Sequence, residues 1–314
     1  MPDIGLVGCG NWGKNILRDL LTLECRVHVA DREQERRNLA LTMGAHSVCT
    51  QSEDLPECDG FVVAVPIDSL AEQVLALLPR GVPIFSEKTL CPSRAEADSL
   101  RRAGADGRVF LMHKWEYHNG IRALRALVEQ GRIGELEQIR CRREGWVAPG
   151  RPPDALTLLA IHDLTIIRHI LGEFPEPDYA LMTVHDGIPV SLTAVLGKGP
   201  RAVMSIDARH PENCRAVTLM GSLGAAHLSG SYADHILVRD KNGEECIDFE
   251  TNMPLADELR EFVAFLEGGP APRCGFDHAE QAAWVLDSLR RCAAMQHEQP
   301  EQELPGKPEP ESEK

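Results

Sequence analysis

The sequence predicts an α/β protein of two domains, in which an amino-terminal, doubly wound parallel sheet precedes an α+β domain with a largely antiparallel sheet. Three observations lead to this prediction. The chain has 314 residues, the length of two domains of about 150 residues each. Its first 120 residues alternate short apolar runs with amphipathic segments. After Tyr179, helical patterns give way to a series of strand patterns.

The first domain, residues 1–120, is predicted from strand–helix alternation. Its apolar runs are apolar on both faces, which is typical of parallel strands covered by helices. These runs are Ile4–Val7, Arg26–Ala30, Gly60–Val65, Val82–Phe85 and Arg108–Met112. The amphipathic segments between them are Lys14–Leu23, Glu33–Met43, Leu70–Leu78 and Ser93–Arg102.

The second domain, residues 121–297, begins with a predicted helix at Ile121–Gln130, which Gly131 ends, and a long strand at Glu135–Trp146. Pro152-Pro153-Asp154 predicts the start of a further helix, with Asp154 as its N-cap and Gly172 as its end. Strands are then expected at Tyr179–His185, Pro189–Leu196, Arg201–Arg209, Cys214–Gly221, Ala225–Ser229, Ile236–Arg239 and Glu245–Phe249, and closing helices at Leu255–Leu266 and His278–Met295.

Composition excludes several classes of function. The chain has 33 Lys and Arg against 48 Asp and Glu, a net charge of −15, which argues against nucleic-acid binding and against docking on anionic lipid. It has no apolar run of the roughly 20 residues that span a bilayer, and its amino terminus lacks the pattern of a signal peptide. Ten scattered cysteines without a Cys-x-x-Cys motif indicate reduced thiols in a cytoplasmic protein. The Glu- and Pro-rich residues 298–314 predict a disordered acidic tail.

The clearest motif is Gly8-Cys9-Gly10-Asn11-Trp12-Gly13, a G-x-G-x-x-G between a predicted strand and a predicted helix. In that context the first glycine permits the tight turn, the second lets the backbone approach a pyrophosphate, and the third allows the helix to pack closely on the strand. The amino end of the helix offers free N–H groups to the phosphates. The motif therefore predicts a Rossmann domain that binds a dinucleotide.

The residue at the end of the second predicted strand indicates which dinucleotide is bound. Asp31 stands where an acidic side chain accepts hydrogen bonds from the adenosine ribose, and its charge repels a 2′-phosphate. This favours NAD. NADP stays an alternative because Arg32, Arg36 and Arg37 follow directly, and an adjacent arginine is what a 2′-phosphate site uses.

Ligands of open parallel sheets lie beyond the carboxyl ends of the strands. Three segments emerge there: Ala64-Val65-Pro66, Glu87-Lys88-Thr89 and His113-Lys114-Trp115-Glu116-Tyr117. We expect Val65, Pro66 and Glu87 to contact the cofactor and Lys88 to lie near the nicotinamide. His113, Trp115 and Tyr117 are candidates for the cleft wall, although packing at the domain junction explains them nearly as well.

Several motifs together resemble the glucose–fructose oxidoreductase / inositol dehydrogenase family (Gfo/Idh/MocA). They are the glycine loop with Trp12, Glu87-Lys88, Gly131-x-Ile133-Gly134 and Ile161-His162-Asp163, followed by Leu171-Gly172-Glu173. The resemblance covers residues 3–296. Trp12, the His113-x-Trp115-x-Tyr117 stretch and the His162-Asp163 pair are most similar to the nucleotide-sugar 3-dehydrogenase branch.

The resemblance implies an NAD(P)-dependent dehydrogenase that acts on a CH–OH group of a sugar, nucleotide sugar or polyol. Lys88 would assist proton transfer, His162 would contact the reacting hydroxyl, and Asp163 would lie beside the substrate. It also implies an open-faced second sheet that makes the contacts of a homo-oligomer, a dimer or tetramer. Five arginines, at positions 140, 142, 143, 151 and 168, hint at an anionic substrate.

Two positions depart from the family pattern. Thr89 follows Lys88 where the family usually has proline. Leu158 stands four residues before His162, where many members carry an aspartate on the same helix face, and Asp163 points about 100° away. A second hypothesis is therefore a nucleotide-binding sensor or structural subunit that retains the fold without the chemistry. No metal site is predicted, because His169 and His162 share a face without carboxylates at a matching spacing.

Overall fold

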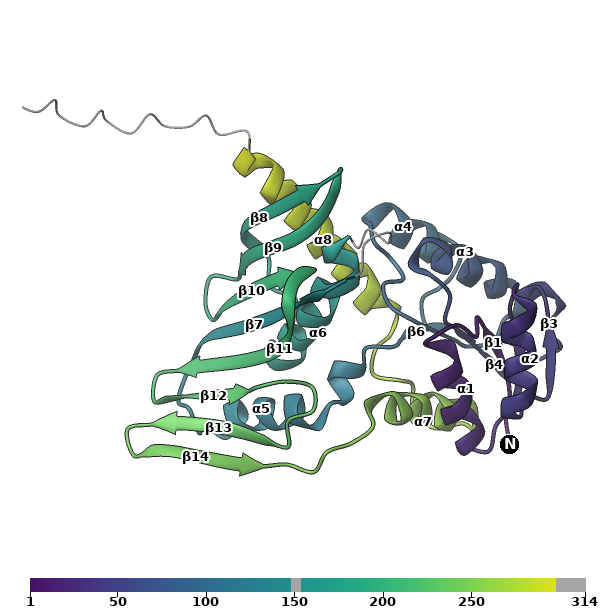
Figure 1. Ribbon diagram of the computed structural model, residues 1–314, viewed down its shortest axis with the longest axis horizontal. Coiled ribbons are helices and arrows are strands. Elements are labelled where there is room, and N and C mark those ends of the chain that lie inside the picture. Colours follow the sequence, from purple (N-terminus) through teal and green to yellow (C-terminus); the bar gives the residue numbers. More distant parts are fainter. Residues whose placement is uncertain (148–153, 298–314) are drawn as a thin grey trace, which may run out of the picture.

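The structure, a computed structural model, describes residues 1–147 and 154–297 (Figure 1). Its amino-terminal half is a parallel sheet of six strands in the order β3-β2-β1-β4-β5-β6, which confirms the predicted doubly wound sheet. The strands are β1 (Asp3–Val7), β2 (Arg26–Ala30), β3 (Ser47–Cys49), β4 (Gly60–Val63), β5 (Ile84–Ser86) and β6 (Val109–Leu111). The sequence prediction missed β3, which has only three half-buried residues at the edge of the sheet.

Helices cover both faces of this sheet (Figure 1). They are α1 (Gly13–Thr22), α2 (Gln34–Met43), α3 (Ile67–Leu77) and α4 (Arg94–Arg102), with short 3-10 turns at Ser52–Asp54 and Leu78–Arg80. Ser93 and Glu96 form a capping box that starts α4, each side chain accepting from the other's backbone N–H. Ile16, Leu17 and Leu20 of α1 are fully buried against the sheet, as their helical spacing predicts.

The second half is a sheet of eight strands in the order β14-β13-β12-β11-β7-β10-β9-β8. The strands are β7 (Leu136–Trp146), β8 (Pro177–His185), β9 (Ile188–Leu196), β10 (Arg201–Asp207), β11 (Arg209–Gly221), β12 (Gly224–Leu228), β13 (His235–Asp240) and β14 (Gly243–Asp248). All neighbours pair antiparallel except β10 and β7, which are parallel. Along β7, buried Ile139 and Cys141 alternate with exposed Arg140 and Arg142, the pattern of a sheet with one packed and one open face.

The helix predicted over 155–171 is not uniform. Residues Leu156–Ala160 form a π-helical turn, and a regular helix, α6 (Ile161–Leu171), follows it. Asp154 caps the segment as predicted, since its side chain accepts from the backbone N–H of Leu156 at 3.0 Å. Gly172 ends α6 in the left-handed conformation, with φ of 86°. Pro152 and Pro153 lie outside the described residues, as do residues 298–314.

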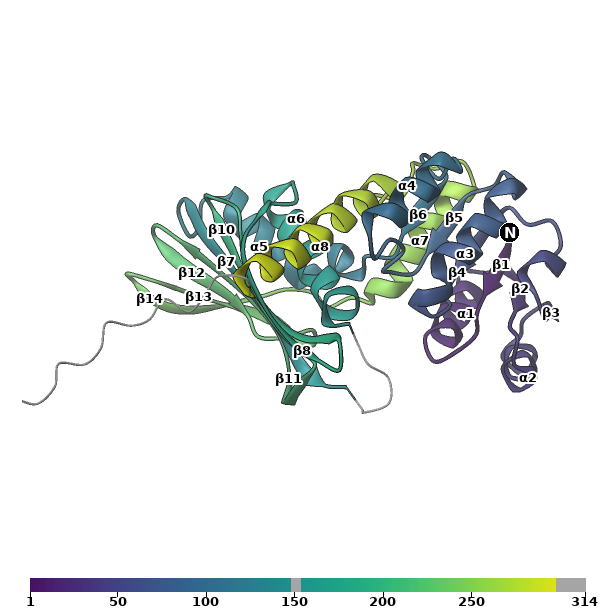
Figure 2. The same ribbon diagram turned by 90° about the horizontal axis from the view of Figure 1, so that it is seen from above.

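Two late helices tie the halves together. After the 3-10 turn Lys114–Tyr117 and α5 (Asn119–Glu129), the chain builds the second sheet and then returns through α7 (Pro254–Leu266), which packs against α1. The last helix, α8 (Phe276–His297), contacts both halves (Figure 2). Its residues Phe276 and Ala279 belong to the core of the first half, and Leu286 and Leu289 belong to the core of the second.

All ten cysteines are free thiols. Within residues 1–147 and 154–297, no helix is both long enough and apolar enough to cross a membrane.

Candidate active site at the carboxyl ends of the first sheet

The glycine loop has two glycines that the fold requires and one that it does not. Gly8 has φ of 90°, and a Cβ there would lie 2.6 Å from the carbonyl oxygen of Ala64. A Cβ on Gly13 would collide with the carbonyl of Gly8. A Cβ on Gly10, however, would meet nothing closer than the guanidinium of Arg36 at 3.7 Å. Gly10 therefore leaves a bare stretch of backbone that faces open space, the surface that a pyrophosphate requires.

Asp31, at the end of β2, is buried and supports this loop. One carboxylate oxygen accepts from the N–H of Cys9 at 2.7 Å, and the other accepts from the N–H of Glu33 at 2.9 Å. Each oxygen keeps a second lone pair, so the carboxylate can still accept from a ribose hydroxyl. The guanidinium of Arg37 is committed to the carbonyls of residues 31 and 32. Arg32 is exposed beside the loop, whereas half-buried Arg36 lies 2.9 Å from the carboxylate of Glu33 and 3.9 Å from that of Asp31.

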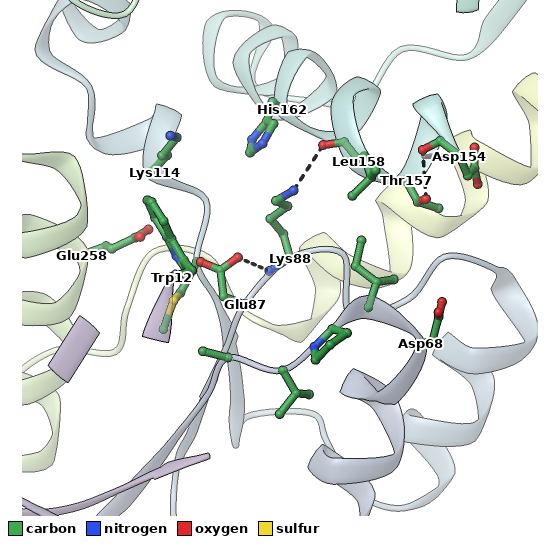
Figure 3. Close-up of a pocket in the computed structure, with 15 residues that line it drawn as sticks. Trp12, Asp68, Glu87, Lys88, Lys114, Asp154, Thr157, Leu158, His162 and Glu258 are labelled. Atoms are coloured by element: carbon green, nitrogen blue, oxygen red, sulfur yellow. Dashed lines mark hydrogen bonds between the residues drawn. The ribbon is translucent and has the colours of Figure 1, made fainter. Parts of the chain in front are cut away.

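A cavity of about 730 Å³ lies next to the loop, between the two halves (Figure 3). Six of its lining residues are among the predicted site residues: Trp12, Val65, Pro66, Glu87, Lys88 and His162. The others are Ala64, Ile67, Asp68, Met112, Lys114, Asp154, Thr157, Leu158 and Glu258. Carboxyl ends of β4 and β5, the start of α6 and the helix α7 thus meet in one place.

Lys88 is held against the π-helical turn. Its Nζ donates to the main-chain carbonyl of Leu158 at 3.2 Å, and the hydroxyl of Thr89 donates to the carbonyl of Thr157 at 2.6 Å. The peptide bond between Lys88 and Thr89 is cis. Because a π-helical turn shifts the regular bonding pattern, main-chain carbonyls in it become free for side chains. In Figure 3 the side chains of Lys88 and His162 point toward the same space in the cavity.

The cavity lowers the proton affinity of its bases. Burial lowers the pKa of Lys88, an effect that the carboxylate of Glu87 opposes and the charge of Lys114 reinforces. Burial also lowers the pKa of His162 well below its ordinary value, and the charge of Lys88 adds to this. Both side chains are therefore biased toward their neutral forms, which can accept a proton.

Glu258 of α7 is an acid in the same cavity. It is 1% exposed, and its Oε2 has no hydrogen-bond partner among the described residues. Burial raises the pKa of Glu258 well above its ordinary value, and the nearby Glu87 raises it further. This carboxyl is therefore biased toward its neutral form.

Four predicted cleft residues lie elsewhere. Trp115 lines a neighbouring cavity of about 530 Å³, which it shares with Trp12 and Lys114. His113 and Tyr117 are buried and line neither cavity, because the 3-10 turn directs them into the junction between the halves. Asp163 is 1% exposed and lines neither cavity; its Oδ1 pairs with Arg143 at 2.6 Å, and its Oδ2 is buried without a hydrogen-bond partner among the described residues.

The arginines support an anionic substrate less strongly than their positions in the sequence suggested. Arg143 is committed to Asp163, and Arg168 lies 3.5 Å from the carboxylate of Glu116. Arg140 and Arg142 lie on the open face of β7, and Arg151 lies outside the described residues.

Sequence reasoning missed Lys114 and Glu258. Lys114 stands inside a segment that it did single out, between His113 and Trp115. Glu258 comes from a helix that is distant in the sequence and returns to the first half, so only the contact between α7 and α1 reveals it.

The fold and the cavity define a dinucleotide-binding α/β protein in which a cofactor loop and a buried lysine open onto one cavity. The oxidoreductase family with an NAD-binding Rossmann fold, GFO_IDH_MocA, matches residues 3–113. This match confirms, over residues 3–113, the resemblance to the Gfo/Idh/MocA oxidoreductases that the sequence predicts.

Curated relatives match over part of their length. Inositol 2-dehydrogenase of Pseudomonas fluorescens is 34% identical over 185 residues, which cover 54% of this chain and 55% of the relative. The 2,7-anhydro-N-acetylneuraminate hydratase of Escherichia coli is 25% identical over 192 residues, which cover 56% of this chain and 51% of the relative. The matched part thus spans about half the length of these relatives.

Solved structures match over nearly the whole fold. The 3-ketoreductase KijD10 of Actinomadura kijaniata superposes with a TM-score of 0.83 at 18% identity, covering 92% of this chain and 96% of that one. The UDP-N-acetylglucosamine 3-dehydrogenase GnnA of Acidithiobacillus ferrooxidans has a TM-score of 0.79 at 18% identity, covering 94% and 98%. At this identity the likeness concerns the fold of both halves.

Proposed function

We propose that this protein is an NAD-dependent oxidoreductase that transfers a hydride between the nicotinamide and a hydroxyl-bearing or keto carbon of a sugar, nucleotide sugar or polyol. One observation carries the proposal: Lys88 and His162 share a cavity with the glycine loop, and the pKa of each is lowered. The dehydrogenases among the relatives support the substrate class.

The residues have the following roles in this proposal. The backbone of Gly8, Gly10 and Asn11 and the amino end of α1 hold the pyrophosphate, and Asp31 holds the adenosine ribose. A nicotinamide bound there would supply the acceptor for the hydride that leaves the carbon bearing the hydroxyl. Lys88 takes the hydroxyl proton at Nζ as the C–H bond breaks, and His162 holds the same oxygen. The products are a ketone, the reduced cofactor and one proton on the protein.

NAD is the proposed cofactor over NADP. The carboxylate of Asp31 would repel a 2′-phosphate bound next to it, and Arg37, one of three nearby arginines, is bonded to the backbone. Arg32 and Arg36 keep NADP as the alternative, which a comparison of the two dissociation constants by calorimetry decides. A 2′-phosphate that binds more tightly would reverse the preference.

A direct assay tests the activity. Protein, NAD and a panel of inositols, free sugars and nucleotide sugars should produce the absorbance of the reduced cofactor with at least one substrate. Lys88→Met should reduce turnover by at least about a hundredfold, the usual scale of general acid–base catalysis, and should keep NAD binding. Lys241→Met, on the turn between β13 and β14, is the matched control and should change nothing. Full turnover by Lys88→Met would contradict the assigned chemistry.

Leu158 favours a second candidate, a subunit that binds NAD without turning substrate over. In place of the family carboxylate, the main-chain carbonyl of Leu158 accepts the hydrogen bond from Lys88. Such a protein would bind NAD or NADH in calorimetry and show no turnover with any substrate in the panel.

The organisation of the chain is part of the proposal. Residues 1–120 would act as the cofactor domain and residues 121–297 as the substrate and oligomerisation domain. The open face of the second sheet would pair copies of the chain into a dimer or tetramer. Light scattering of the purified protein measures the mass, and a monomer at micromolar concentration would exclude the pairing.

A further inference from the structure

A cluster of metal-binding side chains lies outside the cavity. Glu116 comes from the 3-10 turn after β6, Cys274 from the segment before α8, and His278 from the first turn of α8. All three are buried, and their ligand atoms lie within 4.8 Å of one another. The backbone of Cys274 is fixed, because its carbonyl accepts from the N–H of Leu111 at 2.8 Å. None of these residues lines either cavity.

The cluster contains polar atoms without partners. Among the described residues, Oε1 of Glu116 and Nδ1 of His278 are buried and make no hydrogen bond. His169 of α6 lies beside Glu116, with its Nδ1 3.9 Å from Oε2 of that residue, and its Nε2 is buried without a partner among the described residues. Since most buried polar groups are hydrogen-bonded, the unpartnered Nδ1 of His278 in a cluster with a buried carboxylate and a buried thiol indicates a missing partner.

The spacing and the chemistry of the ligand atoms fit zinc. With zinc–ligand bonds of roughly 2.0–2.3 Å, the atoms of a tetrahedral site lie roughly 3.3–3.8 Å apart, so atoms of this cluster need to approach one another by at most about 1.5 Å. A thiolate, imidazoles and a carboxylate are the side chains that zinc takes in proteins. The Nε2 of His278 lies 3.8 Å from the carboxylate of Asp277, the kind of outer partner that orients a metal-bound histidine.

We propose that Glu116, Cys274 and His278 bind one structural zinc ion at the junction of the two halves, and that His169, next to Glu116, moves in as the fourth ligand. Binding displaces the thiol proton of Cys274, so that sulfur binds the metal as thiolate. Arg168, whose guanidinium is 3.5 Å from Oε1 of Glu116, stays beside the carboxylate, which binds the metal through Oε2. The ion links the 3-10 turn after β6, α6 and α8. The sequence does not reveal the site, because its ligands come from three separate segments.

Metal analysis of the full chain tests this proposal. Untagged protein from cells grown with added zinc should contain about one zinc per chain after gel filtration. Cys274→Ser and His278→Asn should each lower that content at least tenfold. Cys91→Ser is the matched control, because Cys91 is equally buried in the same core as Cys274 and belongs to no ligand cluster. The control should keep its zinc.

A spectroscopic arm avoids dependence on the folding of the variants. Wild-type protein stripped with a chelator and loaded with cobalt should show a thiolate-to-cobalt charge-transfer band and tetrahedral d–d bands. Added zinc should remove these bands and should raise the melting temperature of the stripped protein. Wild-type protein that binds neither metal at about one equivalent, or a Cys274→Ser variant that keeps full zinc content, would overturn the proposal. In that outcome the ion pair of Glu116 with Arg168 alone accounts for the cluster.

Discussion

The side-chain amine of Lys88 donates a hydrogen bond to the main-chain carbonyl of Leu158 at a distance of 3.2 Å. The acceptor is therefore part of the backbone, and the leucine side chain takes no part in it. The π-helical turn Leu156–Ala160 presents this carbonyl to the cavity. A neutral carbonyl orients the amine without adding the negative charge that a carboxylate would add, so it leaves the pKa of Lys88 low.

Two substitutions at position 158 distinguish the effect of the main-chain carbonyl on activity from that of the side chain. Leu158→Ala should keep turnover within about threefold of wild type, because the carbonyl is unchanged. Leu158→Asp should place a carboxylate near the amine and raise the pKa of Lys88, so its activity should need a higher pH. Initial rates of both variants from pH 6 to 10 check this. Equal profiles for Leu158→Asp and wild type would show that the side chain does not reach Lys88.

The rate should depend on the protonation of Lys88. Burial lowers the pKa of Lys88 below the ordinary value of 10.5, so the neutral amine is present at lower pH than in a surface lysine. For the oxidation, kcat/KM should rise with pH to a plateau, with an apparent pKa below 10.5. Lys88→Arg should lose this limb, because arginine does not titrate in this range. If kcat/KM of Lys88→Arg still rises with pH in the same range, the rise reports the titration of another group.

Acid should destabilise the fold through His162. Its folded pKa lies well below 6.5, so below pH 6.5 the unfolded chain takes up a proton that the folded chain does not. The unfolded state then binds more protons, so the free energy of unfolding decreases as the pH is lowered, by up to about 1.4 kcal/mol per pH unit. His162→Gln should have a smaller slope between pH 6.5 and 5 in urea denaturation. His185→Gln, at an exposed position, is the control and should keep the wild-type slope.

The glycine loop should respond differently at two positions. Gly10→Ala should fold normally and lose most of its affinity for NAD, because only the ligand comes close to a Cβ there. Gly13→Ala should lose about 1–3 kcal/mol of stability, because its Cβ collides with the carbonyl of Gly8. Thermal melting and calorimetry with NAD separate the two effects. Wild-type affinity in Gly10→Ala would place the cofactor elsewhere.

Because burial raises the pKa of Glu258, this position should tolerate an uncharged amide side chain. Because its folded pKa is raised, the unfolded chain releases this proton above about pH 4.5 while the folded chain retains it, and stability is lost as pH rises. Glu258→Gln removes that loss and should be more stable than wild type at pH 7. Urea denaturation at pH 5 and pH 7 measures the difference, with exposed Glu57→Gln as the control. A destabilised Glu258→Gln would mean that the carboxyl is ionised or donates an essential hydrogen bond.

Much of the architecture follows from the sequence because its causes are local. The buried strands of the first half are continuous apolar runs, and the loop Gly8–Gly13 combines a tight turn with a helix start. The prediction that Lys88 lies at the cavity rests on its position directly after a buried strand. The strand β3 was missed because an edge strand of three half-buried residues carries little apolar pattern.

The rest depends on contacts between distant segments. Glu258 and the cluster around Glu116 come together only when α7 and α8 fold back onto the first half. His113 was expected in the cleft, yet the 3-10 turn carries it into the junction. The π-helical turn differs from a regular helix only in which backbone groups are hydrogen-bonded. The apolar pattern of residues 155–171 is the same in both cases, so it does not reveal the turn.

The 22-residue helix α8 has a consequence for how the molecule comes apart. The first turns of α8 pack into the hydrophobic core of the first half, and its later turns pack into that of the second. If either half unfolds, apolar side chains of α8 therefore become exposed to water. Heating should therefore melt the two halves together, in a single calorimetric transition. A substrate that brings the halves closer would have to move them relative to this common helix.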